Sequence, residues 1–253
     1  MDDQARAIKW YLDNSAKLDL RIKKFKWNLP FDSNIVDCQA TIKIDGHSFE
    51  GRGSDFSDDT AFLKALGEAL DRFLHYKYEG EASTTSGFAT HVNFEKAIMA
   101  SQYEIIERDK FLCHFLTNTP FYSSSINLDQ LKMNKDFFEY LENRKVEFNL
   151  MEMRKSKMAS SFIFWASGLR ASTPFGLSFG LGCHHNPIDA ATSAVLEGLR
   201  HIQWILEQEN LEYLNFADFG NISDSLISQH IKLALNPQYF KEVSVLFGKI
   251  NQN

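Results

Sequence analysis

The sequence lacks the short motifs that mark common hydrolase, zinc and nucleotide sites. No GxSxG, HExxH or CxxC pattern occurs in its 253 residues, so nothing indicates a serine hydrolase or a zinc enzyme. No GxxxxGK[ST] occurs either, which excludes a P-loop. Cysteines are few. Cys38, Cys113 and Cys183 are widely spaced and odd in number, as expected for reduced thiols in a cytoplasmic protein.

Long apolar runs and an excess of positive charge are also absent. The opening MDDQARAIKWYLDNSAK has no apolar signal-peptide core, and no run approaches membrane-spanning length, so we expect a cytoplasmic protein with no membrane partner. A formal net charge of −6 argues against a nucleic-acid partner, which needs a basic patch. No low-complexity linker divides the chain, so we expect a single domain over residues 1–253.

The apolar periodicity predicts strands that alternate with helices. Residues 36–44 alternate between apolar and polar, Asp45-Gly46 suits a tight hairpin turn, and residues 47–52 return as the partner strand. Further strands are expected at 18–27, 146–153, 160–166 and 177–181. Helices are expected at 5–12, 59–78, 94–109, 128–141, 188–208, 226–235 and 238–247, with a loop at 117–126. This order predicts an α/β architecture, with α+β as the alternative, in which helices pack on a mixed sheet.

The stretch 84–109, TTSGFATHVNFEKAIMASQYEIIERD, is the most informative part of the chain. It begins with small and polar residues around Gly87, where a backbone can approach a ligand, and Asn93 is suited to cap the helix that follows. That helix carries Glu104, Glu107 and Arg108, and both carboxylates project from one face. Taken alone, a solvated face with an ordinary ion pair is the simpler interpretation.

Repetition favours a functional interpretation instead. A shift of 36 positions aligns Glu68 with Glu104, and a shift of 93 aligns Glu104 with Glu197. The same two shifts align Gly51 and Gly180 with Gly87, Ala61 and Ala190 with Ala97, Asp71 with Glu107, Arg72 with Arg108, His184 with His91, and Asn186 with Asn93. The sequence therefore predicts three glycine loops, each leading into a helix with a glutamate at the same phase.

Carboxylates that converge in one cleft need a compensating cation. Mg²⁺ binds carboxylates together with substrate phosphate oxygens. We therefore predict these metal ligands: Glu68, Asp71, Glu104, Glu107 and Glu197. Guanidinium groups bind phosphates in bidentate fashion, so Arg72, Arg108 and Arg200 are predicted to contact a nucleotide. His184-His185 is a poor metal pair, because adjacent side chains point in different directions, and His184 near a phosphate is the better hypothesis.

These runs, GRGSDFSDDTAFLKALGEALDR, SGFATHVNFEKAIMASQYEIIERD and the Gly180–His201 segment, resemble the ATP-binding core of the YcaO superfamily. The resemblance covers roughly residues 51–203. It implies a YcaO-like fold that binds ATP and Mg²⁺, with Ser86 and Asn93 added to the residues that contact the nucleotide. No residue is assigned as catalytic.

The resemblance implies an enzyme that phosphorylates backbone amide oxygens of a ribosomally synthesised peptide. Azoline formation from Cys, Ser or Thr, as in bacteriocin-like natural products, is the first expectation, and thioamide or amidine formation is the alternative. Related enzymes commonly need a ThiF-like or winged-helix partner that holds the leader peptide, so a hetero-complex or a homodimer is expected. Val92, Lys96 and His201 depart from the family pattern, which leaves open a degenerate subunit that binds a partner enzyme or a peptide. A purely structural role for the repeats is the third possibility.

Overall fold

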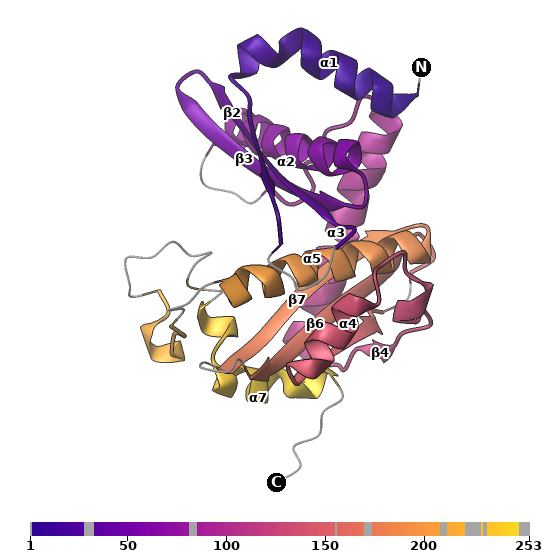
Figure 1. Ribbon diagram of the computed structural model, residues 1–253, viewed down its shortest axis with the longest axis vertical. Coiled ribbons are helices and arrows are strands. Elements are labelled where there is room, and N and C mark those ends of the chain that lie inside the picture. The colour runs from indigo at the N-terminus through magenta and orange to yellow at the C-terminus, as the bar shows by residue number, and fades with distance from the viewer. Residues whose placement is uncertain are drawn as a thin grey trace. The chain divides into compact units, whose positions relative to one another are not determined.

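Two antiparallel sheets, each covered by a long helix, organise the chain (Figure 1). The computed structural model describes residues 2–27, 33–80, 85–154, 156–169, 174–207, 212–220, 229 and 232–247. The chain divides into two compact units, residues 1–105 and 106–253. The predicted mixture of helices and strands is confirmed, but the described strands form two antiparallel sheets instead of one mixed sheet. The expectation of one domain over residues 1–253 stays a prediction.

The first unit is built on a three-stranded sheet with the order β1-β2-β3. Its elements are α1 (Asp3–Leu18), β1 (Arg21–Phe25), β2 (Val36–Ile44), β3 (His47–Asp55), α2 (Asp58–Glu79) and the start of α3 (Phe94–Thr117). Asp45 and Gly46 both have positive φ, 51° and 83°, as the predicted two-residue hairpin requires. Every second residue of β2, from Cys38 to Ile42, is fully buried against the alanine-rich face of α2.

The second unit is built on a four-stranded sheet with the order β4-β5-β6-β7. Its elements are the rest of α3, β4 (Tyr122–Ser123), η1 (Leu128–Gln130), α4 (Asp136–Asn143), β5 (Val146–Glu152), β6 (Ser160–Leu169), β7 (Pro174–His184), α5 (Pro187–Glu207), η2 (Phe216–Asp218), α7 (Pro237–Val243) and η3 (Ser244–Phe247).

Strand β6 is buried on both of its faces, as its nearly continuous apolar run predicts. Ile163 and Trp165 face the core that also contains Val243 of α7 and Phe247 of η3. Phe164 points the other way and lies under α5. In Figure 1, α5 and α7 accordingly lie on opposite sides of this sheet.

Several predicted boundaries are wrong. Helix α1 runs to Leu18, well past residue 12, because Asp2 caps its start and no breaker follows. The helix predicted at 128–141 is split into η1 and α4, and just before α4 the Asn134 side chain accepts a hydrogen bond from the Asp136 amide. The predicted loop 117–126 contains the short strand β4. Half of the helix predicted at 226–235 lies outside the described residues.

Candidate functional site

A strand followed by a closely packed helix occurs once in each unit. Gly51 lies in β3 and Gly180 lies in β7, as the strands predicted at 47–52 and 177–181 require, so the glycine loops inferred from the repeat are wrong at these two positions. A Cβ atom on Gly51 would overlap the Ala65 carbonyl oxygen of α2, and one on Gly180 would overlap the Gly198 nitrogen of α5. Only a residue without a side chain permits this approach, so both glycines are required by packing.

The glutamate of each strand–helix pair ties its helix to the preceding strand. The Glu68 carboxylate accepts a hydrogen bond from the Arg52 amide of β3 at 2.7 Å. Glu197 accepts from the Leu181 amide of β7, also at 2.7 Å. The equal phase seen in the sequence therefore corresponds to an equal hydrogen bond in the two units. One oxygen of each carboxylate therefore has a structural role, because it binds the helix to the strand.

The middle repeat has a different local structure. Gly87 lies in a turn with φ 85°, and its amide donates to Glu104 at 3.1 Å. The Ser101 hydroxyl of α3 donates to the Gly87 carbonyl at 2.5 Å, so this turn is held against the helix through both its amide and its carbonyl. Ser86 is the neighbouring residue in the same turn. A glycine loop of the predicted kind is thus present here, whereas the other two repeats provide strands.

The predicted capping role of Asn93 is confirmed. Its side-chain oxygen accepts from the Lys96 amide at 3.1 Å, and its own amide donates to His91 Nδ1 at 2.9 Å. The third repeat has the same arrangement, in which the Asn186 amide donates to His184 Nδ1 at 3.2 Å. The aligned His and Asn residues therefore build equivalent helix entrances. In both His–Asn pairs, this contact uses the histidine Nδ1 atom and the asparagine backbone amide. It assigns no ligand to the other polar atoms of these residues.

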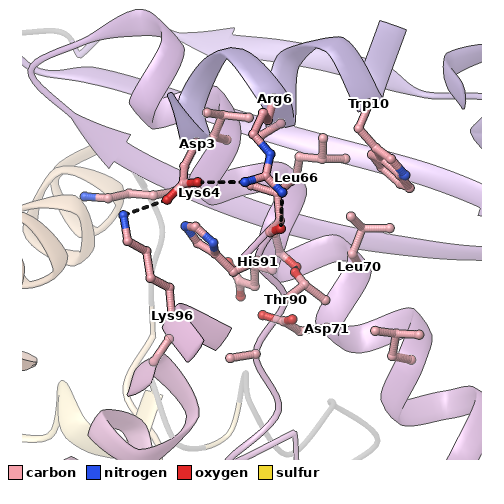
Figure 2. A pocket seen from close by; sticks show the side chains of 18 of the residues that line it. Asp3, Arg6, Trp10, Lys64, Leu66, Leu70, Asp71, Thr90, His91 and Lys96 are labelled. Carbon is pink, nitrogen blue, oxygen red and sulfur yellow. Dashed lines mark hydrogen bonds and ion pairs between the residues drawn. The ribbon is translucent and has the colours of Figure 1, made fainter. Parts of the chain in front are cut away.

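A pocket of about 1050 Å³ lies within the first unit (Figure 2). Helices α1 and α2, residues 89–92 and the first turns of α3 line it. Its walls are largely apolar, with Trp10, Leu66 and Leu70 among the lining side chains. Two of the predicted metal ligands, Glu68 and Asp71, belong to the same wall. The pocket thus joins an apolar cavity to a pair of carboxylates.

Asp71 is a strongly perturbed carboxylate. Burial, with a smaller effect of the charges on Glu104 and Glu68, raises its pKa to about 7, although hydrogen bonding from Thr90 lowers the pKa. Its Oδ1 atom is buried and has no hydrogen-bond partner. Figure 2 shows Asp71 beside Thr90 at the wall of the pocket. A buried carboxylate oxygen without a donor is costly, and a cation at this position would remove the cost.

The predicted phosphate-binding residues have different surroundings. Arg72 is exposed and pairs with Glu68 at 2.6 Å, one turn away on α2. Arg108 lies on the exposed face of α3 and Arg200 lies half-buried on α5. Burial and the neighbouring His185 lower the pKa of His184. The His184 imidazole is therefore mostly neutral at pH 7, and it is suited to phosphate as a hydrogen-bond donor more than as a cation.

The five predicted metal ligands lie in both units. Glu68, Asp71 and Glu104 belong to the first unit, and their charges act on one another, as the raised pKa of Asp71 indicates. Glu107 and Glu197 belong to the second unit. The hypothesis that all of them share one cleft stays a prediction.

No pattern in the sequence indicated the α1 side of the pocket. Arg6 donates to the Val92 carbonyl at 3.0 Å, and Asp3 pairs with Lys96 at 2.7 Å. A second missed feature is Asp37, which is fully buried and accepts from the Arg52 guanidinium at 2.6 Å and 3.1 Å. The apolar–polar alternation of residues 36–44 could have indicated the role of Asp37, because an acidic residue inside a predicted buried strand requires a partner.

The chain belongs to the YcaO family. The family model described as YcaO cyclodehydratase, ATP- and Mg²⁺-binding, matches residues 72–242, which is more than half of the chain. A search of curated proteins finds no match. None of the described helices meets the length and hydropathy needed to span a membrane.

Solved structures of YcaO proteins and heterocyclases have the same fold. The structure of YcaO from Methanopyrus kandleri bound with AMPPCP and Mg²⁺ is 14% identical, with 81% of this chain and 70% of that chain covered at a TM-score of 0.58. A heterocyclase in complex with substrate and cofactor is 11% identical, with 97% of this chain and 48% of that chain covered at a TM-score of 0.63. A chain of the E. coli microcin synthetase McbBCD complex is 11% identical, with 92% of this chain and 75% of that chain covered at a TM-score of 0.62. The chain therefore spans about half the length of the heterocyclase and most of the length of the other two.

ATP and Mg²⁺ are the cofactors of this family. In the described part of the chain, no three His, Cys, Asp or Glu side chains form a ready-made metal site. Mg²⁺ does not require one, since it usually binds one or two carboxylates and completes its shell with water and phosphate oxygens. The oxygen donors around the pocket and the unpartnered Oδ1 of Asp71 fit such an ion.

Proposed function

We propose that this protein uses ATP and Mg²⁺ to activate a backbone amide of a ribosomally synthesised peptide, with azoline formation as the product class. The observation that carries the proposal is Asp71, whose buried Oδ1 atom has no hydrogen-bond partner, at the wall of a large pocket in a chain of the YcaO family. When bound, ATP supplies the phosphoryl group that converts the amide oxygen into a leaving group, and Mg²⁺ neutralises phosphate charge.

The residues of this chain position and neutralise the reactants. The proposed Mg²⁺ ligands are Glu68, Asp71, Glu104, Glu107 and Glu197. Arg72, Arg108 and Arg200 are proposed to bind phosphate oxygens through their planar guanidinium groups. Ser86, Asn93 and His184 complete the proposed nucleotide contacts. Catalysis of this kind depends mainly on positioning and electrostatic stabilisation, so no covalent role is assigned to a side chain.

We propose that the substrate is a precursor peptide held by a separate leader-binding protein in the cytoplasm. The similar structures include a heterocyclase in complex with substrate and a microcin synthetase complex of several subunits, which supports a multi-protein context. Thioamide or amidine formation uses the same amide activation and is the alternative product class.

A second candidate function, a non-catalytic subunit, has specific support. The three positions that depart from the family pattern all have structural contacts. Val92 accepts from Arg6, Lys96 pairs with Asp3, and His201 Nδ1 lies 2.9 Å from the Phe179 carbonyl oxygen. These contacts form without a nucleotide, so they give the three residues structural roles.

The reaction itself distinguishes the two candidates. The full chain would be incubated with ATP, Mg²⁺, a Cys/Ser/Thr-rich precursor peptide and its leader-binding partner, and both phosphate release and peptide mass would be followed. Loss of water from the peptide, matched by phosphate release, is expected. Phosphate release without a mass change would contradict azoline formation, and tight nucleotide binding without turnover would favour the non-catalytic subunit.

A further inference from the structure

Ionisable side chains from three segments meet at one end of the pocket (Figure 2). Asp3 and Arg6 come from the first turns of α1, His91 from the loop before α3, and Lys96 from the first turn of α3. All four side chains line the pocket. Three of them are basic groups, and Asp3 is the carboxylate among them.

Asp3 acts as the ligand of this basic cluster. Its Oδ2 atom lies 2.7 Å from Lys96 Nζ, and its Oδ1 atom lies 3.4 Å from an Arg6 guanidinium nitrogen. Lys96, His91 and Arg6 all lower the pKa of Asp3, with the hydrogen bond from Lys96 as the largest cause. The second guanidinium nitrogen of Arg6 donates to the Val92 carbonyl at 3.0 Å, which fixes the Arg6 guanidinium beside the loop that precedes α3. A carboxylate thus already occupies the place where an anion would bind.

The rest of the pocket defines what kind of anion fits. Trp10, Leu63 and Leu70 provide apolar walls, so the cavity suits a ligand with an apolar or aromatic body and a charged end. Guanidinium and ammonium groups together favour a phosphate, which the arginine fork matches in geometry. Glu68 and Asp71 line the same cavity, and Mg²⁺ held by carboxylates commonly bridges phosphate oxygens.

We propose that Arg6, His91 and Lys96 form a phosphate subsite that Asp3 occupies until a phosphorylated ligand displaces it. The inference rests on the proposed function, because it adds a contact to the nucleotide site, and it assigns a role to α1, which lies outside the matched family segment 72–242. Asp3 is then an internal competitor, and its displacement breaks the ion pair that joins α1 to α3. Lys96, which departs from the family pattern, gains a function in place of the usual acidic residue.

Binding measurements on the full chain test the subsite. Pyrophosphate and Mg²⁺·AMP-PCP are titrated calorimetrically into wild type, Asp3→Asn and Lys96→Met at two salt concentrations. Asp13→Asn and Lys9→Met serve as matched controls, since both residues are exposed, lie on α1 and are absent from the pocket lining. Thermal unfolding of each variant confirms that it is folded.

Removal of the competitor should strengthen anion binding. Asp3→Asn is expected to raise the affinity for both probes about two- to five-fold, the range for an exposed ion pair. Lys96→Met is expected to lower both affinities by a similar factor and to reduce their dependence on salt. Affinities of Asp3→Asn and Lys96→Met equal to those of their controls would overturn the subsite.

The two probes separate this inference from the proposed function. If pyrophosphate binds with the expected order of variants and Mg²⁺·AMP-PCP does not bind wild type, the subsite stands and the nucleotide function fails. If Mg²⁺·AMP-PCP binds wild type and no variant changes its affinity, the nucleotide function stands and the subsite is refuted. Binding of neither probe refutes both.

Discussion

Replacement of Asp71 by asparagine should change how the stability of the protein depends on pH. In the folded chain, burial and the charges of Glu104 and Glu68 raise the pKa of Asp71 from 3.8 to about 7. The folded state therefore holds a proton that the unfolded state releases, and the free energy of unfolding falls as the pH rises between these two values. Below the lower value this loss is absent, and above the higher value it is complete. An asparagine side chain does not ionise, so the variant lacks this contribution.

The expected size of the effect follows from the shift. Each pKa unit corresponds to about 1.4 kcal/mol, so the roughly two units between pH 5 and pH 7 correspond to about 2–3 kcal/mol. Urea unfolding at pH 5 and pH 8 would measure the free energies of unfolding of wild type and Asp71→Asn without added Mg²⁺. Between pH 5 and pH 8, the free energy of unfolding of Asp71→Asn should rise by this amount relative to that of wild type.

Glu142→Gln is the control, because Glu142 is exposed on α4 and lies outside the repeats. Its difference from wild type should be the same at both pH values. An Asp71→Asn difference that is also independent of pH would show that Asp71 is not a buried, perturbed carboxylate, and the argument for a cation site beside it would lose its main support.

Three further substitutions test contacts within the repeats. Glu197→Ala should lower the free energy of unfolding by about 1.5–3 kcal/mol, the usual value for a hydrogen bond to a charged group, and an unchanged urea midpoint would contradict the bond to Leu181. Gly180→Ala should destabilise by at least about 1–3 kcal/mol, the cost of overpacking, because its Cβ would overlap the α5 backbone; thermal unfolding measures this, and a neutral result would exclude the close approach. Asn93→Ala should cost about 1 kcal/mol through loss of the α3 cap, whereas Asn93→Asp should retain most of that stability in the same assay.

Periodicity and turn chemistry were sufficient to predict most of the fold. The alternation in 36–44 and the Asp45-Gly46 turn predicted the β2–β3 hairpin, because both signals depend on neighbouring residues alone. Sheet topology depends on contacts between distant residues, and here the prediction of one mixed sheet was not met. The extension of β7 beyond residue 181 to His184 was also missed, since a glycine such as Gly182 resembles a loop until the partner helix is known.

The candidate site was predictable in its residue types and less so in its geometry. The common phase of Glu68 and Glu197 was visible as a repeat, and the structure adds that each binds a strand amide. The role of α1 was not predictable, because the ion pair of Asp3 with Lys96 joins residues far apart in the chain and no local pattern records it. The perturbed pKa of Asp71 likewise arises from burial, which sequence alone does not show.

Calorimetric titration of AMP-PCP into the protein, with and without Mg²⁺, tests whether carboxylates hold a magnesium–nucleotide complex here. We expect that binding requires Mg²⁺ and that Glu104→Gln weakens it at least about ten-fold, more than the roughly 0–1 kcal/mol of an exposed ion pair would explain. Glu142→Gln should bind as wild type does. Binding that is independent of Mg²⁺, or an unchanged affinity in Glu104→Gln, would contradict a carboxylate-held magnesium–nucleotide site in this protein.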